Sequence, residues 1–243
     1  MKTKILLSTI ILIFGYLNLN AQTNTGIQTP YVGQYAPAFK AESTTGTINF
    51  PSDYYNKWRI LFSHPADFTP VCSSEIISLA AKQDEFKKLN TALIVISTDG
   101  LNSHIEWEKS MESISYKGQP TVKINFPLVA DVSMEVSKKY NLLSKDTLQR
   151  KDMRSVIFID PDNKIRAILT YPDNIGRNID EIERILIALQ TADKDQVLTP
   201  ANWKQGDDVL IPSPKSMDES KKMAEKNKPG YYNLAWYMWF RKL

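Results

Sequence analysis

Short apolar runs of strand length alternate along this chain with segments of helical periodicity, and this alternation restricts the fold more than any other feature of the sequence. The runs occupy residues 58–63, 92–98, 126–131 and 155–160. Their length and their content of Ile, Val, Leu and Phe are typical of buried β-strands. Strands that alternate with helices in this order predict an α/β fold, in which helices cover both faces of one sheet.

Two helices are expected between the first three strands. Thr69 is a suitable N-cap and Pro70 a suitable first residue for the first helix, whose apolar positions follow a helical repeat to Leu89. Ser103 and Glu106 have the spacing of a capping box. We therefore expect the second helix to begin near this pair.

The pattern closes with a β-hairpin and a third helix. The letters "DPDNK" at residues 160–164 form a turn signal between the strand at 155–160 and the run "IRAILTY" at 165–171. These two strands should therefore pair as a hairpin. Asn178 and Glu181 repeat the capping-box spacing and predict the start of the last helix.

Composition divides the chain into three parts. Residues 1–21 contain two lysines, an apolar run and a small final residue, Ala21, which is the layout of a signal peptide for export to the periplasm or the exterior. The run is shorter than the roughly 20 residues of a membrane-spanning helix, so no stable membrane insertion is expected after cleavage. An uncleaved anchor is the alternative. Residues 22–193 should form the main domain, preceded by an arm with a small hairpin at "STTGT".

Residues 194–243 form a C-terminal extension of different composition. The extension is rich in turn residues, then in charged residues, and ends in the aromatic segment "YYNLAWYMWF" at residues 231–240. So many aromatic side chains indicate either a small satellite core or an interface.

Charge and cysteine content exclude several other classes. The formal net charge is +3, and two of the lysines lie in residues 1–21, so no nucleic-acid or anionic partner is indicated. The single cysteine, Cys72, cannot form an internal disulfide. The fold must therefore depend on its apolar core.

Cys72 falls in the first turn of the helix that follows the first strand. Unpaired N–H groups and the positive end of the helix dipole favour an anion there, so this position stabilises a thiolate over a thiol. The position suits a reactive sulfur. A small, buried and unreactive apolar residue is the other interpretation of a lone cysteine.

The segment around Cys72 resembles the active-site motif of the peroxiredoxin family, Pro-x-x-x-Thr-x-x-Cys, here Pro65, Thr69 and Cys72. The longer match "SHPADFTPVC" is similar to the one-cysteine, peroxiredoxin-6 type, and the resemblance extends from Gly33 to about Pro212. It implies a thioredoxin-like fold with a central mixed sheet flanked by helices and a C-terminal extension. It also implies a homodimer, with no cofactor and no metal.

The resemblance assigns roles to seven residues. Cys72 would be the nucleophile that attacks the peroxide, Thr69 would hold the peroxide and the thiolate, and Pro65 would shield the pocket from water. The others match the arginines and supporting residues of the family: Arg154 as the active-site arginine, Arg177 as a second arginine, and Glu75 and His64 as the supporting shell.

These matches predict a thiol-dependent peroxidase with a role in antioxidant defence. The Cys72 thiolate would reduce hydrogen peroxide and organic hydroperoxides and become a sulfenic acid. Because the chain has no second thiol, an external thiol reductant of unknown identity would have to complete the cycle.

Three other functions remain to be weighed. A cysteine hydrolase needs a base beside the thiol, and the sequence offers only His64 and His104. His104 is expected to face solvent in the first turn of its helix. A metal site has few donors, with one Cys and two His. A chaperone or interaction module on the same scaffold is the main alternative from another class.

Overall fold

The structure is a computed structural model that describes residues 30–145, 150–224 and 229–243. The predicted signal segment, residues 1–21, lies outside the described residues. The elements have the following bounds: strands β1 (Phe39–Ser43), β2 (Gly46–Phe50), β3 (Trp58–Ser63), β4 (Thr91–Ser97), β5 (Leu128–Ala130), β6 (Arg154–Ile159), β7 (Ile165–Tyr171), β8 (Val209–Leu210), β9 (Tyr231–Ala235) and β10 (Met238–Arg241), and helices α1 (Pro70–Ala81), α2 (Gln83–Lys88), α3 (Leu101–Met111), α4 (Glu135–Lys139), α5 (Ile179–Asp195) and α6 (Met217–Ala224).

A mixed sheet of seven strands forms the centre of the molecule, in the order β2-β1-β5-β4-β3-β6-β7. Strands β3, β4 and β5 are parallel, while β6 pairs antiparallel with both β3 and β7. The predicted hairpin of β6 and β7 is therefore confirmed, as is the small hairpin of β1 and β2. The end of β3 lies beside the start of β6, a juxtaposition that the active site uses.

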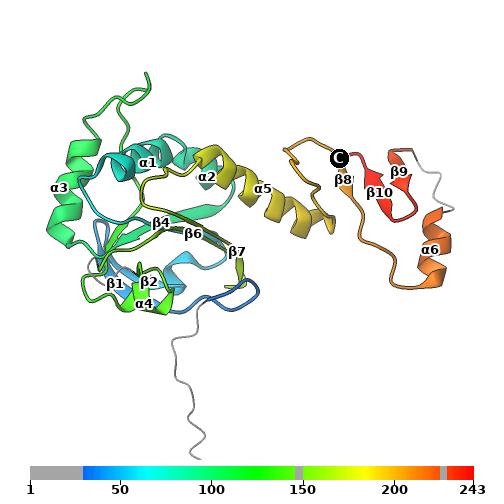
Figure 1. Cartoon of the computed structure of the whole chain (residues 1–243), viewed down its shortest axis with the longest axis horizontal. Coiled ribbons are helices and arrows are strands. Elements are labelled where there is room, and N and C mark those ends of the chain that lie inside the picture. The colour runs from blue at the N-terminus through cyan, green and yellow to red at the C-terminus, as the bar shows by residue number, and fades with distance from the viewer. Residues whose placement is uncertain (1–29, 146–149, 225–228) are drawn as a thin grey trace, which may run out of the picture.

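Helices cover both faces of this sheet, as predicted, but unequally (Figure 1). Successive side chains of a strand point to opposite faces, so Ile60 and Phe62 pack with α1, α2, α3 and α5 in one core. Leu61 points the other way and packs with residues of α4 and of the β1–β2 hairpin in a second core. Four of these five helices thus share the face on which Cys72 lies.

Two helix predictions need correction. The helix expected from Pro70 to Leu89 is broken at Lys82, which leaves α1 and α2 as separate helices. Helix α3 begins at Leu101 with the extended Gly100 as its N-cap, so Ser103 lies inside the helix and does not cap it.

The start of the last helix agrees with its sequence signal. Asn178 is the N-cap of α5, and its side chain accepts a hydrogen bond from the backbone N–H of Glu181.

The C-terminal extension contains a second, three-stranded sheet in the order β8-β10-β9. Figure 1 shows this sheet beyond the end of α5, away from the central sheet. Trp203 of the extension is buried against α5, in a small core with Ala188, Val197 and Val209. Across the described ranges, no helix is both long enough and apolar enough to cross a membrane.

Candidate active site

The loop between β3 and α1 carries the motif that contains Cys72. Phe68 adopts a left-handed backbone conformation with φ 53°, which is uncommon for a bulky residue and marks a site where the surroundings dictate the turn. Thr69 follows in an extended conformation and occupies the N-cap position of α1. Its hydroxyl does not cap the helix but donates to the carbonyl of Ala66 at 2.9 Å.

Cys72 is the third residue of α1 and is fully buried. Arg154, the first residue of β6, donates from Nη1 to the Cys72 Sγ at 3.2 Å. Arg154 is itself held by the carbonyl of Asp173, which accepts from its Nε at 2.9 Å. A guanidinium donor and a helix N-terminus at the same sulfur stabilise the thiolate.

Glu75 joins the two predicted arginines. Its Oε2 accepts from Arg154 Nη1 at 2.8 Å and from Arg177 Nη2 at 2.7 Å. Its Oε1 accepts from the backbone N–H of Arg177 at 2.7 Å and from Arg177 Nε at 2.9 Å. A carboxylate with both oxygens bonded in this way fixes the guanidinium groups in one orientation.

Arg177 connects this hydrogen-bond network to the end of β3 and the start of β6. Its Nη1 donates to the carbonyls of Ser63 and Ser155, at 2.7 and 2.9 Å. Burial is the main cause that lowers its pKa, while Glu75 acts in the opposite sense. Because the ordinary pKa of arginine is above 12, Arg177 remains a cation in its buried position over the ring of Phe62.

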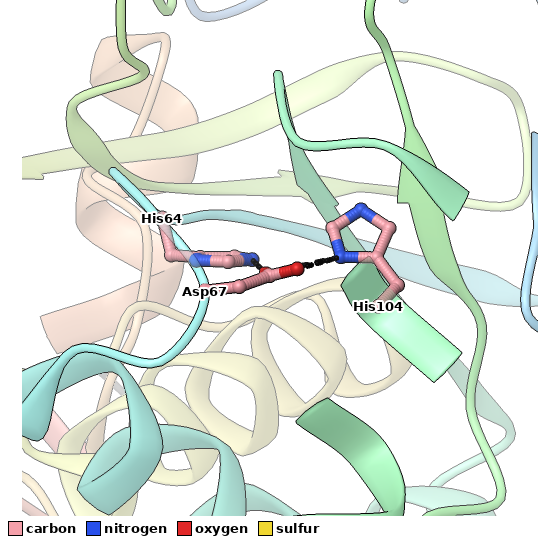
Figure 2. Close-up of side chains that lie close together, drawn as sticks. All are labelled: His64, Asp67 and His104. Carbon is pink, nitrogen blue, oxygen red and sulfur yellow. Dashed lines mark hydrogen bonds and ion pairs between the residues drawn. The ribbon is translucent and has the colours of Figure 1, made fainter. Parts of the chain in front are cut away.

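His64 and His104 lie on the other side of the loop and are both fully buried. The prediction that His104 faces solvent is wrong: the residue is buried, and its Nδ1 is 2.9 Å from the nearer carboxylate oxygen of Asp67 (Figure 2). Its Nε2 is 3.1 Å from the carbonyl of Val129. His64 stacks on Trp107 with 4.9 Å between ring centroids. Burial above all lowers its pKa well below the ordinary value, so its ring is neutral.

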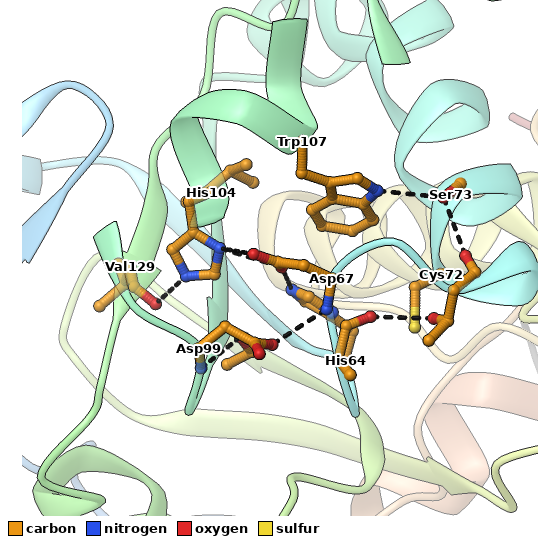
Figure 3. Close-up of polar contacts among 12 residues, drawn as sticks. His64, Asp67, Cys72, Ser73, Asp99, His104, Trp107 and Val129 are labelled. Atoms are coloured by element: carbon orange, nitrogen blue, oxygen red, sulfur yellow. Dashed lines mark hydrogen bonds and ion pairs between the residues drawn. The ribbon is translucent and has the colours of Figure 1, made fainter. Parts of the chain in front are cut away.

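Helix α3 holds the start of α1 through a chain of hydrogen bonds that Figure 3 displays. Trp107 Nε1 donates to the Ser73 hydroxyl at 3.1 Å, and this hydroxyl donates to the carbonyl of Thr69 at 2.8 Å. The backbone N–H of Asp67 donates to Asp99 at 3.0 Å. The loop is thus fastened to neighbouring elements on both sides of Thr69.

The structure brings four of the predicted residues into direct contact: Cys72, Glu75, Arg154 and Arg177. Pro65 and His64 are buried in the same loop. Sequence reasoning missed four residues, Asp67, Ser73, His104 and Trp107. A signal for His104 was present, because it shares a helical face with Trp107 and Met111, three and seven positions further on.

The site consists of a buried cysteine in the first turn of a helix and an arginine of strand β6 that donates a hydrogen bond to its sulfur. On a thioredoxin-like sheet, this arrangement defines a thiol-based peroxidase. Residues 32–168 match the model of the AhpC/TSA family, and residues 188–227 match that of the C-terminal domain of 1-Cys peroxiredoxin. The chain therefore belongs to the peroxiredoxin family, and its single cysteine and its C-terminal domain identify the one-cysteine type.

Known proteins support this assignment over most of the chain. A peroxiredoxin of Methanosarcina mazei is 47% identical over 214 residues, which cover 88% of this chain and 98% of that protein. The yeast mitochondrial 1-Cys peroxiredoxin has a similar structure, with a TM-score of 0.77 and 38% identity over 88% of this chain and 99% of that one. A cysteine-to-serine variant of peroxiredoxin 6 from Arenicola marina also has a similar structure, with a TM-score of 0.78 and 30% identity. The match covers 87% of this chain and 97% of that one.

Proposed function

We propose that this peroxiredoxin is exported, forms a homodimer through its C-terminal extension, and reduces hydrogen peroxide and organic hydroperoxides at Cys72. The observation that carries the assignment of the reacting atom is the hydrogen bond from Arg154 Nη1 to the Cys72 Sγ at 3.2 Å.

In the first step the thiolate attacks the nearer oxygen of the peroxide. A sulfur–oxygen bond forms, the oxygen–oxygen bond breaks, and the leaving alkoxide or hydroxide takes a proton to give an alcohol or water. Negative charge moves from the sulfur to the leaving oxygen, and Arg154, held by Glu75 and Asp173, lies where it can stabilise that charge. The Thr69 hydroxyl already donates to Ala66, so its oxygen is left to accept a hydrogen bond from the peroxide.

In the second step the sulfenic acid reacts with an external thiol. Water leaves, a mixed disulfide forms at Cys72, and a second thiol then releases the Cys72 thiol and a low-molecular-weight or protein disulfide. The absence of a second cysteine from the 243 residues supports this route. Work on the yeast mitochondrial relative concerns resolution by glutathione/thioredoxin systems, and we propose the same classes of reductant here.

The test is steady-state peroxide consumption with a panel of reductants, namely glutathione, a thioredoxin system and dithiothreitol. The wild type should consume peroxide with at least one of them, and Cys72→Ser with none. A matched control is Ser74→Ala, which alters the neighbouring face of α1 without removing the thiol. Equal and negligible consumption by the wild type and Cys72→Ser would instead favour a non-catalytic chaperone or interaction module.

The proposed dimer rests on the exposed apolar surface of the β9–β10 hairpin. Trp236 is 81% exposed and Leu234 is 71% exposed, and Tyr237 beside them is also exposed. Exposed aromatic residues grouped in this way are typical of protein interfaces. We propose that a second copy of the chain covers them.

Sedimentation velocity can test this proposal with the full chain. Leu234→Glu should shift the dimer towards the monomer, while Asn233→Glu is the matched control because neighbouring residues of a strand point to opposite faces. A wild-type protein that sediments as a monomer would contradict the proposal.

The proposed export rests on the sequence of residues 1–21. N-terminal sequencing of protein from fractionated cells should give a chain that begins near Gln22 and lies outside the cytoplasm. A cytoplasmic chain that begins at Met1 would contradict it.

A further inference from the structure

Three buried side chains beside the active-site loop play no part in the peroxide chemistry described above. His64 and Asp67 belong to the loop between β3 and α1, and His104 belongs to the first turns of α3. One nitrogen or oxygen from each lies within 4.8 Å of the others, and all three residues are buried. Figure 2 shows the two rings on either side of the Asp67 carboxylate.

The hydrogen bonds of His104 determine what it presents to this cluster. The carbonyl of Val129 can only accept, so Nε2 of His104, at 3.1 Å, carries a proton. Nδ1 of a neutral ring then directs its lone pair at an oxygen of Asp67 only 2.9 Å away. Two acceptors at this distance require either a proton or a metal cation between them. Metal-bound histidines usually donate their other ring N–H to a carbonyl or carboxylate, as His104 does.

His64 supplies an independent indication of a ligand. Among the residues that the structure describes, no partner of either ring nitrogen has full hydrogen-bond geometry, although the backbone of Ala66 acts on the pKa of His64 against the effect of burial. Its Nε2 is 3.7 Å from the Asp67 carboxylate, which is too far for a hydrogen bond. A fully buried ring without a well-formed hydrogen bond at either nitrogen is costly unless something else satisfies it.

We propose that His64, Asp67 and His104 form a binding site for a divalent transition-metal ion, with Zn²⁺ as the preferred ion. Two imidazoles and one carboxylate are donors that Zn²⁺ accepts, and they suit it better than Mg²⁺ or Ca²⁺, which prefer oxygen ligands. Tetrahedral Zn²⁺ with bonds of about 2.0–2.1 Å places neighbouring donors about 3.4 Å apart. Measured from Oδ1 of Asp67, the separations are 3.0 Å to Nδ1 of His104 and 3.7 Å to Nε2 of His64, on either side of this value. The ligand atoms of the two histidines lie within 4.8 Å of each other.

A metal ion here would tie the active-site loop to α3. His64 and Asp67 flank Pro65 in the motif, and His104 anchors them to a helix whose Trp107 already holds the start of α1. Fixing this loop should slow any opening through which a thiol reductant reaches the fully buried Cys72. We therefore expect Zn²⁺ to lower the rate of the thiol-dependent step more than the rate of the first oxidation.

The direct test uses tag-free wild-type protein labelled with ¹⁵N. The chain has two histidines, so a long-range ¹H–¹⁵N spectrum should contain signals from two rings. Zinc sulfate, added to the folded protein or present during refolding, should shift Nδ1 of His104 and one nitrogen of His64. Ring signals that do not change at any zinc concentration would overturn the proposal and leave a proton between His104 and Asp67.

Equilibrium dialysis against Zn²⁺ then identifies the ligands. The wild type should retain one equivalent, and His64→Gln, Asp67→Asn and His104→Gln should each lower the affinity at least tenfold. Cys72→Ser must bind as the wild type does, since loss of binding there would mean that the thiolate is the ligand. Asp99→Asn is the matched control, because Asp99 meets the cluster only through the backbone N–H of Asp67 and otherwise bonds Ser97, and it should also bind normally.

Discussion

Asp152 makes the stability of this protein depend on pH in a predictable way. It precedes β6 by two residues and is 1% exposed. Its Oδ2 accepts from the Ser137 hydroxyl at 3.0 Å, while its Oδ1 has no partner in the described part of the chain. Burial, followed by the charges of Asp131 and Asp99, raises the pKa of Asp152 from 3.8 to about 7, although the Ser137 hydrogen bond opposes the shift.

The sign and the size of the effect follow from proton linkage. The folded protein holds this proton more tightly than the unfolded chain, so stability is highest below the unfolded pKa and falls as the pH rises through the folded value. At 1.36 kcal/mol per pKa unit, the fully ionised group costs about 4 kcal/mol. Between about pH 5 and about pH 8 the wild type should lose roughly 2.5 kcal/mol through Asp152 alone.

Asp152→Asn should remove this dependence because asparagine has nearly the same shape and stays neutral. The free energy of unfolding can be measured by urea titration at fixed protein concentration. The difference between the variant and the wild type should grow in favour of the variant by roughly 2.5 kcal/mol from the lower to the higher of these two pH values. Asp162→Asn, on the exposed β6–β7 turn, controls for the loss of one negative charge. Parallel stability profiles for the wild type and Asp152→Asn would refute the reasoning.

The active site and its single cysteine support four further predictions. Arg154→Met should slow peroxide reduction about a hundredfold in stopped-flow measurements, because it removes a preorganised donor. Glu75→Gln should lower the free energy of unfolding by about 3 kcal/mol in urea titrations, because it leaves two buried guanidinium groups without their counter-charge. Trp107→Phe should cost about 1 kcal/mol through the lost bond to Ser73, read from the same titrations. By intact mass, one equivalent of peroxide should add one oxygen at Cys72, and excess peroxide should add more; a disulfide-linked dimer on non-reducing gels would contradict the one-cysteine mechanism.

Local signals predicted the fold well where a single element determines its own structure. The run at residues 58–63 matches β3 residue for residue, and Asn178 caps α5 as expected. The break at Lys82, where the backbone leaves helical geometry with φ −108° and ψ 4°, has no local signal in the sequence. The start of α3 at Leu101 was missed because the local capping preference of Ser103 does not decide where the helix begins.

The active site was predictable to the extent that its motif lies in one stretch of chain. The resemblance placed Cys72 and Arg154 in one site, and the hydrogen bond between them joins residues 82 positions apart. The cluster of His64, Asp67 and His104 could not be found by counting likely metal ligands. The cluster exists because the sheet topology places α3, which carries His104, against the loop that carries His64 and Asp67.

The network of Glu75, Arg154 and Arg177 carries two positive charges and one negative charge, so its electrical balance depends on Cys72. The reduced thiolate supplies the missing negative charge, and the site as a whole is then neutral. A sulfenic acid is uncharged and leaves one buried positive charge without compensation, which attracts an incoming thiolate reductant. A sulfinate restores neutrality as well. The same imbalance that draws in the reductant therefore favours irreversible over-oxidation when the reductant is scarce.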